Sequence, residues 1–295
     1  MKAGLLPGVE DYLSSLSAER GLSVNTIAAY RRDLDQYLDF LDQKEPQPSD
    51  IDDFVKHLHR RSLAPASVAR KVAAVRGLHR FLVSEGLALE DPTRLLHPAK
   101  PRESFPKALT VEQTFALVEA PDLGAISGRR DRALLEFLYG TGARVSEAVG
   151  VDLPALDLEA KTVILTGKGD KQRLVPLGTS AAASLVAWLP DRLAISKPGP
   201  SSEALFLNRR GGRLSRQSAF RIVRQHAARV GIDPATVSPH TLRHSAATHM
   251  VEGGADLRSV QVMLGHARIS TTQVYTRVSP QHLVEVFYLS HPRSR

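Results

Sequence analysis

The sequence of 295 residues contains no cysteine, which excludes disulfide bonds, a thiolate nucleophile and cysteine-ligated zinc. It has no run of about 18 apolar residues, so a membrane-spanning helix is not expected. Residues 1–8 carry one lysine and a short apolar stretch, but they lack the apolar core and cleavage site of a signal peptide. These features predict a cytoplasmic protein, and the chain length is natural for two domains.

Acidic side chains are missing from two long stretches of the chain. The net charge is +8, yet the first 100 residues hold 14 basic and 14 acidic side chains and are neutral as a whole. Residues 55–84 contain seven basic side chains and no acid, and residues 209–229 contain seven arginines and no acid. One such stretch is compatible with a solvated helix face. Two of them favour a polyanionic partner such as nucleic acid.

The first 95 residues predict a small all-helical module of about four helices. A short helix is expected at residues 9–16, and apolar residues then recur at helical spacing in segments 27–41, 51–58 and 68–82. Pro46 and Pro48 separate the second helix from the third. Two of these helices carry the first basic stretch. The residues of this module predicted to bind DNA are Arg70, Lys71 and Arg76.

A proline-rich segment follows this module. Residues 91–107 contain four prolines and four basic side chains, which predicts a stiff, extended chain. We therefore place a DNA-binding domain at residues 1–95, a basic linker at 96–108 and a second domain at 109–295. A basic linker between two modules that face DNA favours a clamp around a duplex.

The second domain is predicted to be rich in helices, with one small β-hairpin. Residues 110–113 have the spacing of a capping box at a helix start. Apolar runs at 162–165 and 173–176 flank a glycine-rich turn that carries Lys168 at its tip. A helix is expected at residues 180–189, with its end at Pro190. The fold class is therefore mainly α with a small β-hairpin or sheet.

The chemistry is concentrated between Pro239 and Tyr275. A helix that starts at Pro239 carries His240 and Arg243 three residues apart, on one face. The next helix ends at Gly265, so the following histidine lies just past a helix terminus. A single histidine or tyrosine of this kind is usually structural. Several cations combined with a tyrosine hydroxyl suit a reaction at a phosphodiester, with Tyr275 as the nucleophile.

These motifs resemble those of the tyrosine recombinases, or phage integrase family, and most closely the bacterial Xer type. The resemblance covers nearly the whole chain. One position departs from the family pattern, because Ala143 stands where a leucine is usual. The segments that carry the resemblance are residues 141–147 (TGARVSE), 167–169 (GKG), 238–244 (SPHTLRH), 264–266 (LGH) and 270–275 (STTQVY).

The resemblance implies a four-helix SAM-like core-binding domain and an α-rich catalytic domain that together form a C-shaped DNA clamp. It also implies a role for each catalytic residue. Tyr275 would attack the scissile phosphate and form a 3′-phosphotyrosyl bond. Arg144 and Arg243 would hold the nonbridging oxygens, and Lys168 would protonate the departing 5′-oxygen.

Four further roles follow from the same resemblance. His240 would act as an acid or base, His266 would hydrogen-bond the phosphate, and Glu147 would support Arg144. The arginine-rich helix would enter the major groove of DNA, with Arg216, Gln217 and Arg221 at its DNA surface. No ATP is expected, because the phosphotyrosyl bond conserves the energy of the DNA bond. No metal ion or other cofactor is expected either, because the sequence has no acidic cluster to hold Mg²⁺ and no cofactor signature.

The implied function is the resolution of chromosome and plasmid dimers by a heterotetramer of paired XerC-type and XerD-type recombinases. An FtsK-type DNA translocase would activate the tetramer, and the tail at residues 278–295 would dock on a neighbouring protomer. Segment 254–258 favours the XerD type, whereas the chain end also resembles the XerC type. The alternatives are a phage or mobile-element integrase, a type IB topoisomerase and a DNA-binding protein without catalysis.

Overall fold

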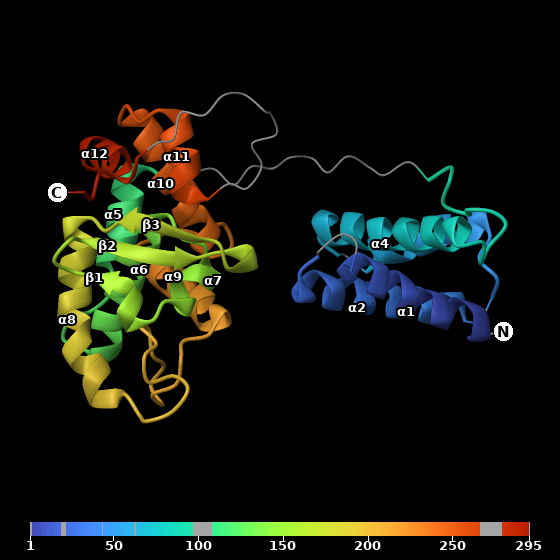
Figure 1. Ribbon diagram of the computed structural model, residues 1–295, viewed down its shortest axis with the longest axis horizontal. Helices are drawn as coiled ribbons and strands as arrows, with labels where there is room; N and C mark the ends of the chain where they lie inside the picture. Colours follow the sequence, from blue (N-terminus) through green and yellow to red (C-terminus); the bar gives the residue numbers. More distant parts are fainter. Residues whose placement is uncertain are drawn as a thin grey trace. The chain divides into compact units, whose positions relative to one another are not determined.

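The computed structural model describes residues 2–18, 22–42, 44–61, 63–96, 108–265 and 279–294 (Figure 1). The chain divides into two compact units, Met1–Ser104 and Phe105–Arg295, and each is considered by itself. Both units are mainly helical, and the only sheet among the described residues has three short strands. The predicted fold class, mainly α with a small sheet, is confirmed. No described helix is both long enough and apolar enough to cross a bilayer.

The described residues of the N-terminal unit form four helices packed around one apolar core. Helix α4 contacts each of the other three, and Tyr37, Phe54 and Leu78 lie fully buried between them. The first helix begins at Lys2, earlier than predicted. Pro7 and Gly8 usually interrupt helices, so the sequence predicts a later start, but this helix continues through both residues. The helices are α1 (Lys2–Ala18), α2 (Val24–Leu41), α3 (Pro48–Arg60) and α4 (Pro65–Ser84).

The C-terminal unit combines further helices with an antiparallel sheet. The sheet order is β1-β2-β3, so the sheet has one more strand than the predicted hairpin. In the pairing of β2 with β3, Leu165 lies opposite Arg173. Its helices are α5 (Val111–Glu119), α6 (Ile126–Thr141), α7 (Val145–Gly150), α8 (Thr179–Ile195), α9 (Arg216–Arg229), α10 (Pro239–Glu252), α11 (Leu257–Leu264) and α12 (Pro280–Ser290). Its strands are β1 (Leu156–Asp157), β2 (Thr162–Thr166) and β3 (Gln172–Pro176).

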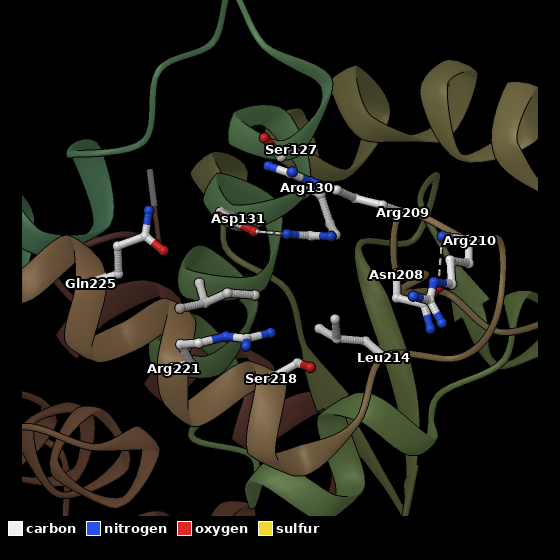
Figure 2. A pocket seen from close by; sticks show the side chains of 11 residues that line it. Ser127, Arg130, Asp131, Asn208, Arg209, Arg210, Leu214, Ser218, Arg221 and Gln225 are labelled. Atoms are coloured by element: carbon white, nitrogen blue, oxygen red, sulfur yellow. Dashed lines mark hydrogen bonds and ion pairs between the residues drawn. The ribbon is translucent and has the colours of Figure 1, made fainter.

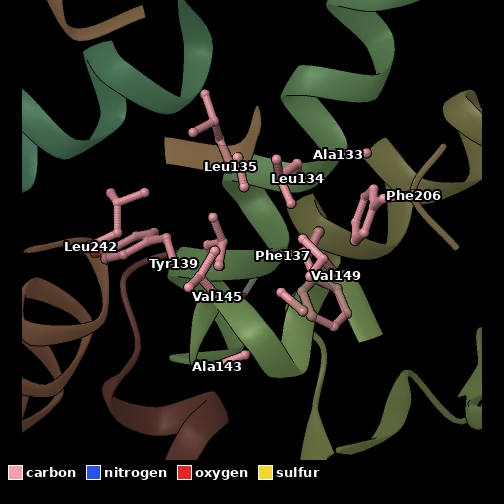
Figure 3. Packing of buried hydrophobic residues seen from close by; sticks show 14 of the residues in the cluster. Ala133, Leu134, Leu135, Phe137, Tyr139, Ala143, Val145, Val149, Phe206 and Leu242 are labelled. Atoms are coloured by element: carbon pink, nitrogen blue, oxygen red, sulfur yellow. The ribbon is translucent and has the colours of Figure 1, made fainter. Parts of the chain in front are cut away.

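Helix α6 runs through the middle of this unit. Its apolar residues face every direction, and it packs against both α8 and α10. Figure 3 shows how Phe137 of α6 lies against Phe206, with ring centroids 5.6 Å apart. The core therefore fixes the C-terminal end of α6, from which the chain turns towards Arg144.

Helix α8 does not end at Pro190, as the sequence predicts, but continues to Ile195. Two side chains bind the helix to the segment that follows it, on either side of the proline. Trp188 Nε1 donates to the carbonyl of Leu205 at 2.9 Å, and Arg192 Nε donates to that of Ala204 at 2.9 Å. These tertiary hydrogen bonds offset the loss of the one backbone bond that proline cannot make.

The described part of the C-terminal tail packs within its own unit. Leu283 and Phe287 of α12 are buried against α10 and α11, and His291 stacks on Phe287 with ring centroids 4.8 Å apart. The Arg293 guanidinium binds the buried Glu136 carboxylate. Of the apolar side chains predicted to contact another protomer, Leu289 is the one that stays largely exposed, at 77%.

Burial of His291 makes the stability of the C-terminal unit depend on pH. Burial lowers the pKa of this imidazole to about 3, whereas the unfolded chain has an ordinary value near ~6.5. Between these values the unfolded state binds more protons, so the free energy of unfolding falls as the pH decreases. We expect urea denaturation to show this loss between pH 7 and pH 5, and His291→Asn to weaken the pH dependence. His282→Gln, a change of an exposed histidine on α12, the helix that His291 caps, should leave the pH dependence intact. Equal slopes in all three proteins would contradict the assignment.

Candidate active site

Arg144 lies at the junction between α6 and α7. Helix α6 ends at Gly142, whose φ of +59° suits glycine, and a Cβ there would also collide with Leu264. Arg144 is then the N-cap of α7, and its backbone N–H donates to Glu147 Oε2 at 2.9 Å. Its guanidinium donates to Glu147 Oε1 at 2.8 Å and to the carbonyl of Gly265 at 3.0 Å. The turn and the cap together fix where this cation stands.

Arg243 projects from α10 to the same place. Its guanidinium donates to the carbonyl of Gly142 at 2.7 Å and to that of Leu264 at 2.8 Å. The side chain is buried, and burial lowers the pKa of Arg243 to about 10, with the neighbouring positive charge of Arg144 acting in the same direction. The structure therefore brings together the two arginines predicted to hold a phosphate, on consecutive carbonyls at the end of α11.

The carboxylate of Glu147 binds two guanidinium groups. Besides Arg144 it accepts bonds from Arg173, at 3.0 Å from Nη1 to Oε1 and 2.7 Å from Nη2 to Oε2. Burial alone would raise the pKa of Glu147, but the hydrogen bonds from Arg173 and then from Arg144 keep it below its ordinary value. Glu147 is thus a buried anion that orients Arg144, as its predicted supporting role requires.

Arg173 belongs to none of the motifs that carry the resemblance, although its position in the strand carries a signal. Arg173 and Val175 are two residues apart in β3, so they point to the same face of the sheet. Val175 lies fully in the core. A cation on the inward face of a strand needs an acidic partner, and that requirement points to a buried carboxylate such as Glu147.

His240 is the exposed residue in the otherwise buried first turn of α10, beside the arginine-rich helix α9. Its ring centroid is 6.1 Å from that of Phe220. A pocket of about 730 Å³ lies between these elements. The pocket is lined by Val145, Arg216, Gln217, Phe220, Arg221, Arg224, Gln225 and His240. The three residues of α9 predicted to bind DNA therefore line the same pocket as His240 and the residue next to Arg144.

A second basic pocket, of about 660 Å³, lies on another side of α9 (Figure 2). Arg221 lines both pockets, and Arg209 and Arg210 add two exposed cations to this one. Arg130 lies at its back and binds Asp131 at 2.6 Å. The cationic surface around α9 thus extends beyond the three residues of this helix predicted to bind DNA.

Three predicted catalytic groups cannot be placed from the structure. His266 and Tyr275 lie outside the described residues, as does the side chain of Lys168. The backbone of Lys168 is described, and it begins the turn between β2 and β3. This turn starts beside the Glu147 carboxylate, since a Cβ built on Gly167 would lie 3.3 Å from Glu147 Oε1.

The basic residues predicted on α4 differ in their surroundings. Lys71 is buried, and its ammonium binds Asp33 at 2.8 Å, where Arg70 binds the other oxygen at 2.6 Å. The Arg70 side chain remains 40% exposed, and Arg76 is partly buried. Because a buried ammonium needs its carboxylate partner, Lys71 serves the interior of the N-terminal unit and does not present a cation on its surface.

The sequence matches a family over both units. Residues 107–282 match the phage integrase family, and residues 9–86 match its N-terminal SAM-like domain. The chain belongs to the phage integrase family, and it is a site-specific tyrosine recombinase, an enzyme that exchanges DNA strands. The alternative of a DNA-binding protein without catalysis is therefore set aside.

Individual relatives agree with this class. The chain is 46% identical over 306 residues to the tyrosine recombinase XerD of Mycobacterium tuberculosis, which covers 97% of this chain and 98% of the relative. It is 41% identical over 292 residues to that of Staphylococcus aureus, with 97% and 99% covered. The crystal structure of XerA recombinase matches with a TM-score of 0.51 at 28% identity, covering 96% and 97% of the two chains. The predicted Xer-type tyrosine recombinase is confirmed.

A DNA-bound structure shares the fold at lower identity. XerH site-specific recombinase bound to a palindromic difH substrate, in a post-cleavage complex, matches with a TM-score of 0.67 at 22% identity. The match covers 92% of this chain and 81% of that one. At this identity the likeness concerns the fold alone, which is that of a recombinase.

Proposed function

We propose that the protein cuts and rejoins DNA at a short chromosomal site and thereby resolves chromosome and plasmid dimers at segregation. One observation carries the proposal: Arg144 and Arg243 converge on the carbonyls of Gly265 and Leu264, immediately before His266 in the sequence. Similarity to relatives named XerD supports the biological setting. The cytoplasm, where the chromosome lies, is the compartment that this function requires.

The reaction begins with attack of Tyr275 on the scissile phosphate. A free tyrosine has a pKa near ~10, so its ionisation at pH 7 costs about 4 kcal/mol. The Arg144 and Arg243 guanidiniums would bind the nonbridging oxygens and stabilise the charge that develops at phosphorus. The Arg243 side chain is buried, and its low exposure to solvent would strengthen this interaction.

Proton transfer accompanies the two bond changes. Lys168 would protonate the departing 5′-oxygen, while His240 would act as the acid or base and His266 would hydrogen-bond the phosphate. The 3′-phosphotyrosyl bond replaces one phosphodiester by another, so an incoming 5′-hydroxyl can reverse the step without ATP. Two such exchanges on paired sites convert a dimeric chromosome into monomers.

Recognition of the duplex would centre on α9. Arg216, Gln217 and Arg221 line the pocket beside His240, where base edges and phosphates are both within the reach of long side chains. In the N-terminal unit, the exposed part of Arg70 and the partly buried Arg76 are the remaining candidates. The C-shaped clamp, in which linker residues 96–108 join the two units around DNA, is part of this proposal.

The enzyme would work as a heterotetramer with a paired Xer recombinase, activated by an FtsK-type DNA translocase. Because Leu283 and Phe287 are buried in their own unit, Leu289 is the apolar side chain of α12 best exposed for docking on a neighbouring protomer. A tail that leaves its own unit for the neighbour would first have to release Arg293 from Glu136.

Covalent trapping tests the reaction. We expect a nicked suicide duplex with the host's recombination site to give an SDS-resistant adduct with the wild-type protein, and none with Tyr275→Phe. The paired recombinase is added in a parallel reaction, because an isolated protomer would await its partner. Absence of a Tyr275-dependent adduct in both reactions would contradict the proposal, whereas an adduct in either supports it.

Leu289 offers a test of the tail. Leu289→Asp should weaken tetramer assembly on DNA, because it places a charge in an apolar contact, while the isolated protein keeps its melting temperature. Leu193→Asp on α8 changes an equally exposed leucine, at 74%, and should assemble normally. Native gels of the protein–DNA complexes give the measurement. Unchanged assembly of Leu289→Asp would rule out docking through this face.

A further inference from the structure

The Arg173 side chain has three of its five N–H groups committed within the protein. Two of them form a paired, nearly parallel set of hydrogen bonds with the Glu147 carboxylate, at 3.0 and 2.7 Å. The third, on Nε, donates to the carbonyl of Met263 at 2.9 Å. The side chain is only 16% exposed, so its contacts with Glu147 and α11 define its environment.

We propose that Arg173 is a positioning residue for strand exchange: it neutralises Glu147, so that the charge of Arg144 remains available to the scissile phosphate, and it anchors the end of α11. The inference rests on the proposed function, in which Arg144 and Arg243 bind that phosphate. Arg173 itself would not touch DNA.

The charges explain the first part of this role. Glu147 is buried and binds both Arg144 and Arg173. With Arg173 present, the group of three arginines and one carboxylate carries two net positive charges, which suits a phosphorus centre that gains negative charge. Without Arg173, the carboxylate would have Arg144 as its principal partner. That guanidinium would then be drawn towards Glu147 and its charge largely cancelled.

The end of α11 explains the second part. The last carbonyls of a helix lack partners within the helix, and cations there are favoured by the helix dipole. In this protein three consecutive carbonyls each receive a different arginine: Met263 from Arg173, Leu264 from Arg243, and Gly265 from Arg144. Two of these donors belong to the proposed phosphate site. When a phosphate accepts hydrogen bonds from Arg144 and Arg243 in place of these carbonyls, the hydrogen bond from Arg173 to the Met263 carbonyl remains.

This anchor acts on the chain just before the catalytic segment. Gly265 has a φ of +69°, and a Cβ there would lie 3.1 Å from Arg173 Cζ, so the guanidinium packs directly on the helix terminus. The next residue in the sequence is His266. A lysine could not replace Arg173 fully, because one ammonium cannot bind both carboxylate oxygens and the carbonyl in this planar arrangement.

Rates and affinities of Arg173 variants test the inference. At saturating suicide duplex we expect Arg173→Gln to form the Tyr275 adduct at least ~10-fold more slowly, because small displacements of catalytic groups reduce rates strongly. The affinity for intact duplex should change by less than ~3-fold, since a positioning residue affects the chemical step more than ground-state binding. Arg173→Lys should recover part of the rate. If Arg173→Gln does not fold, Arg173→Lys with a slowed rate and an unchanged melting temperature supports the inference.

Arg129→Gln is the matched control. Arg129 also binds a carboxylate through two nitrogens, Asp191 at 2.5 and 3.0 Å, and a backbone carbonyl, that of Leu123 at 2.5 Å. The Arg129→Gln variant should lose about as much folding stability as Arg173→Gln, but it should form the Tyr275 adduct at the wild-type rate. Equal slowing of both variants, or wild-type rates for both Arg173 variants, would overturn the inference and leave the proposed function standing. A wild-type protein without a Tyr275-dependent adduct would instead refute the proposed function and the inference together.

Discussion

The proposed active site depends on one buried carboxylate. Glu147 accepts hydrogen bonds from Arg144 and Arg173, and its burial is tolerable because two guanidiniums offset the loss of hydration. It lies in the first turn of α7, where it also caps the helix through the backbone N–H of Arg144. The Glu147 side chain thus stabilises the start of α7 through its bond to the backbone of Arg144, and it orients the guanidinium of the same residue. Arg144 and Arg173 are both positioned by this carboxylate, whereas Arg243 is held by the backbone carbonyls of Gly142 and Leu264.

The arginines in turn connect parts of the chain that are far apart in sequence. Arg243 joins α10 to the turn after α6, Arg173 joins the sheet to α11, and all three arginines meet at the last carbonyls of that helix. The same donors can bind either carbonyl oxygens or phosphate oxygens. The three arginines are therefore already held close together in the structure. In the proposed reaction, phosphate oxygens would replace carbonyl oxygens as the acceptors of Arg144 and Arg243.

Much of this organisation is predictable from the sequence, and the exceptions have physical causes. The capping boxes, the glycine at the end of α11 and the motifs around Arg144 and Arg243 are local signals, so they are readable one segment at a time. The continuation of α8 through Pro190 depends on hydrogen bonds to residues 204 and 205, which no local pattern reveals. The sequence predicts Lys71 as a surface cation, because its buried ion pair with Asp33, 38 residues away along the chain, leaves no local pattern. Arg173 becomes visible only when the inward face of β3 is known.

The most direct test of this account is a double-mutant cycle between Glu147 and Arg173. The rate of adduct formation at saturating suicide duplex is measured for Glu147→Gln, Arg173→Gln and the double variant. If the two side chains act as one unit, the double variant will be about as slow as the slower single variant. Rate losses that multiply in the double variant would show that Arg173 acts independently of Glu147, and would contradict the claim that it works by neutralising this carboxylate.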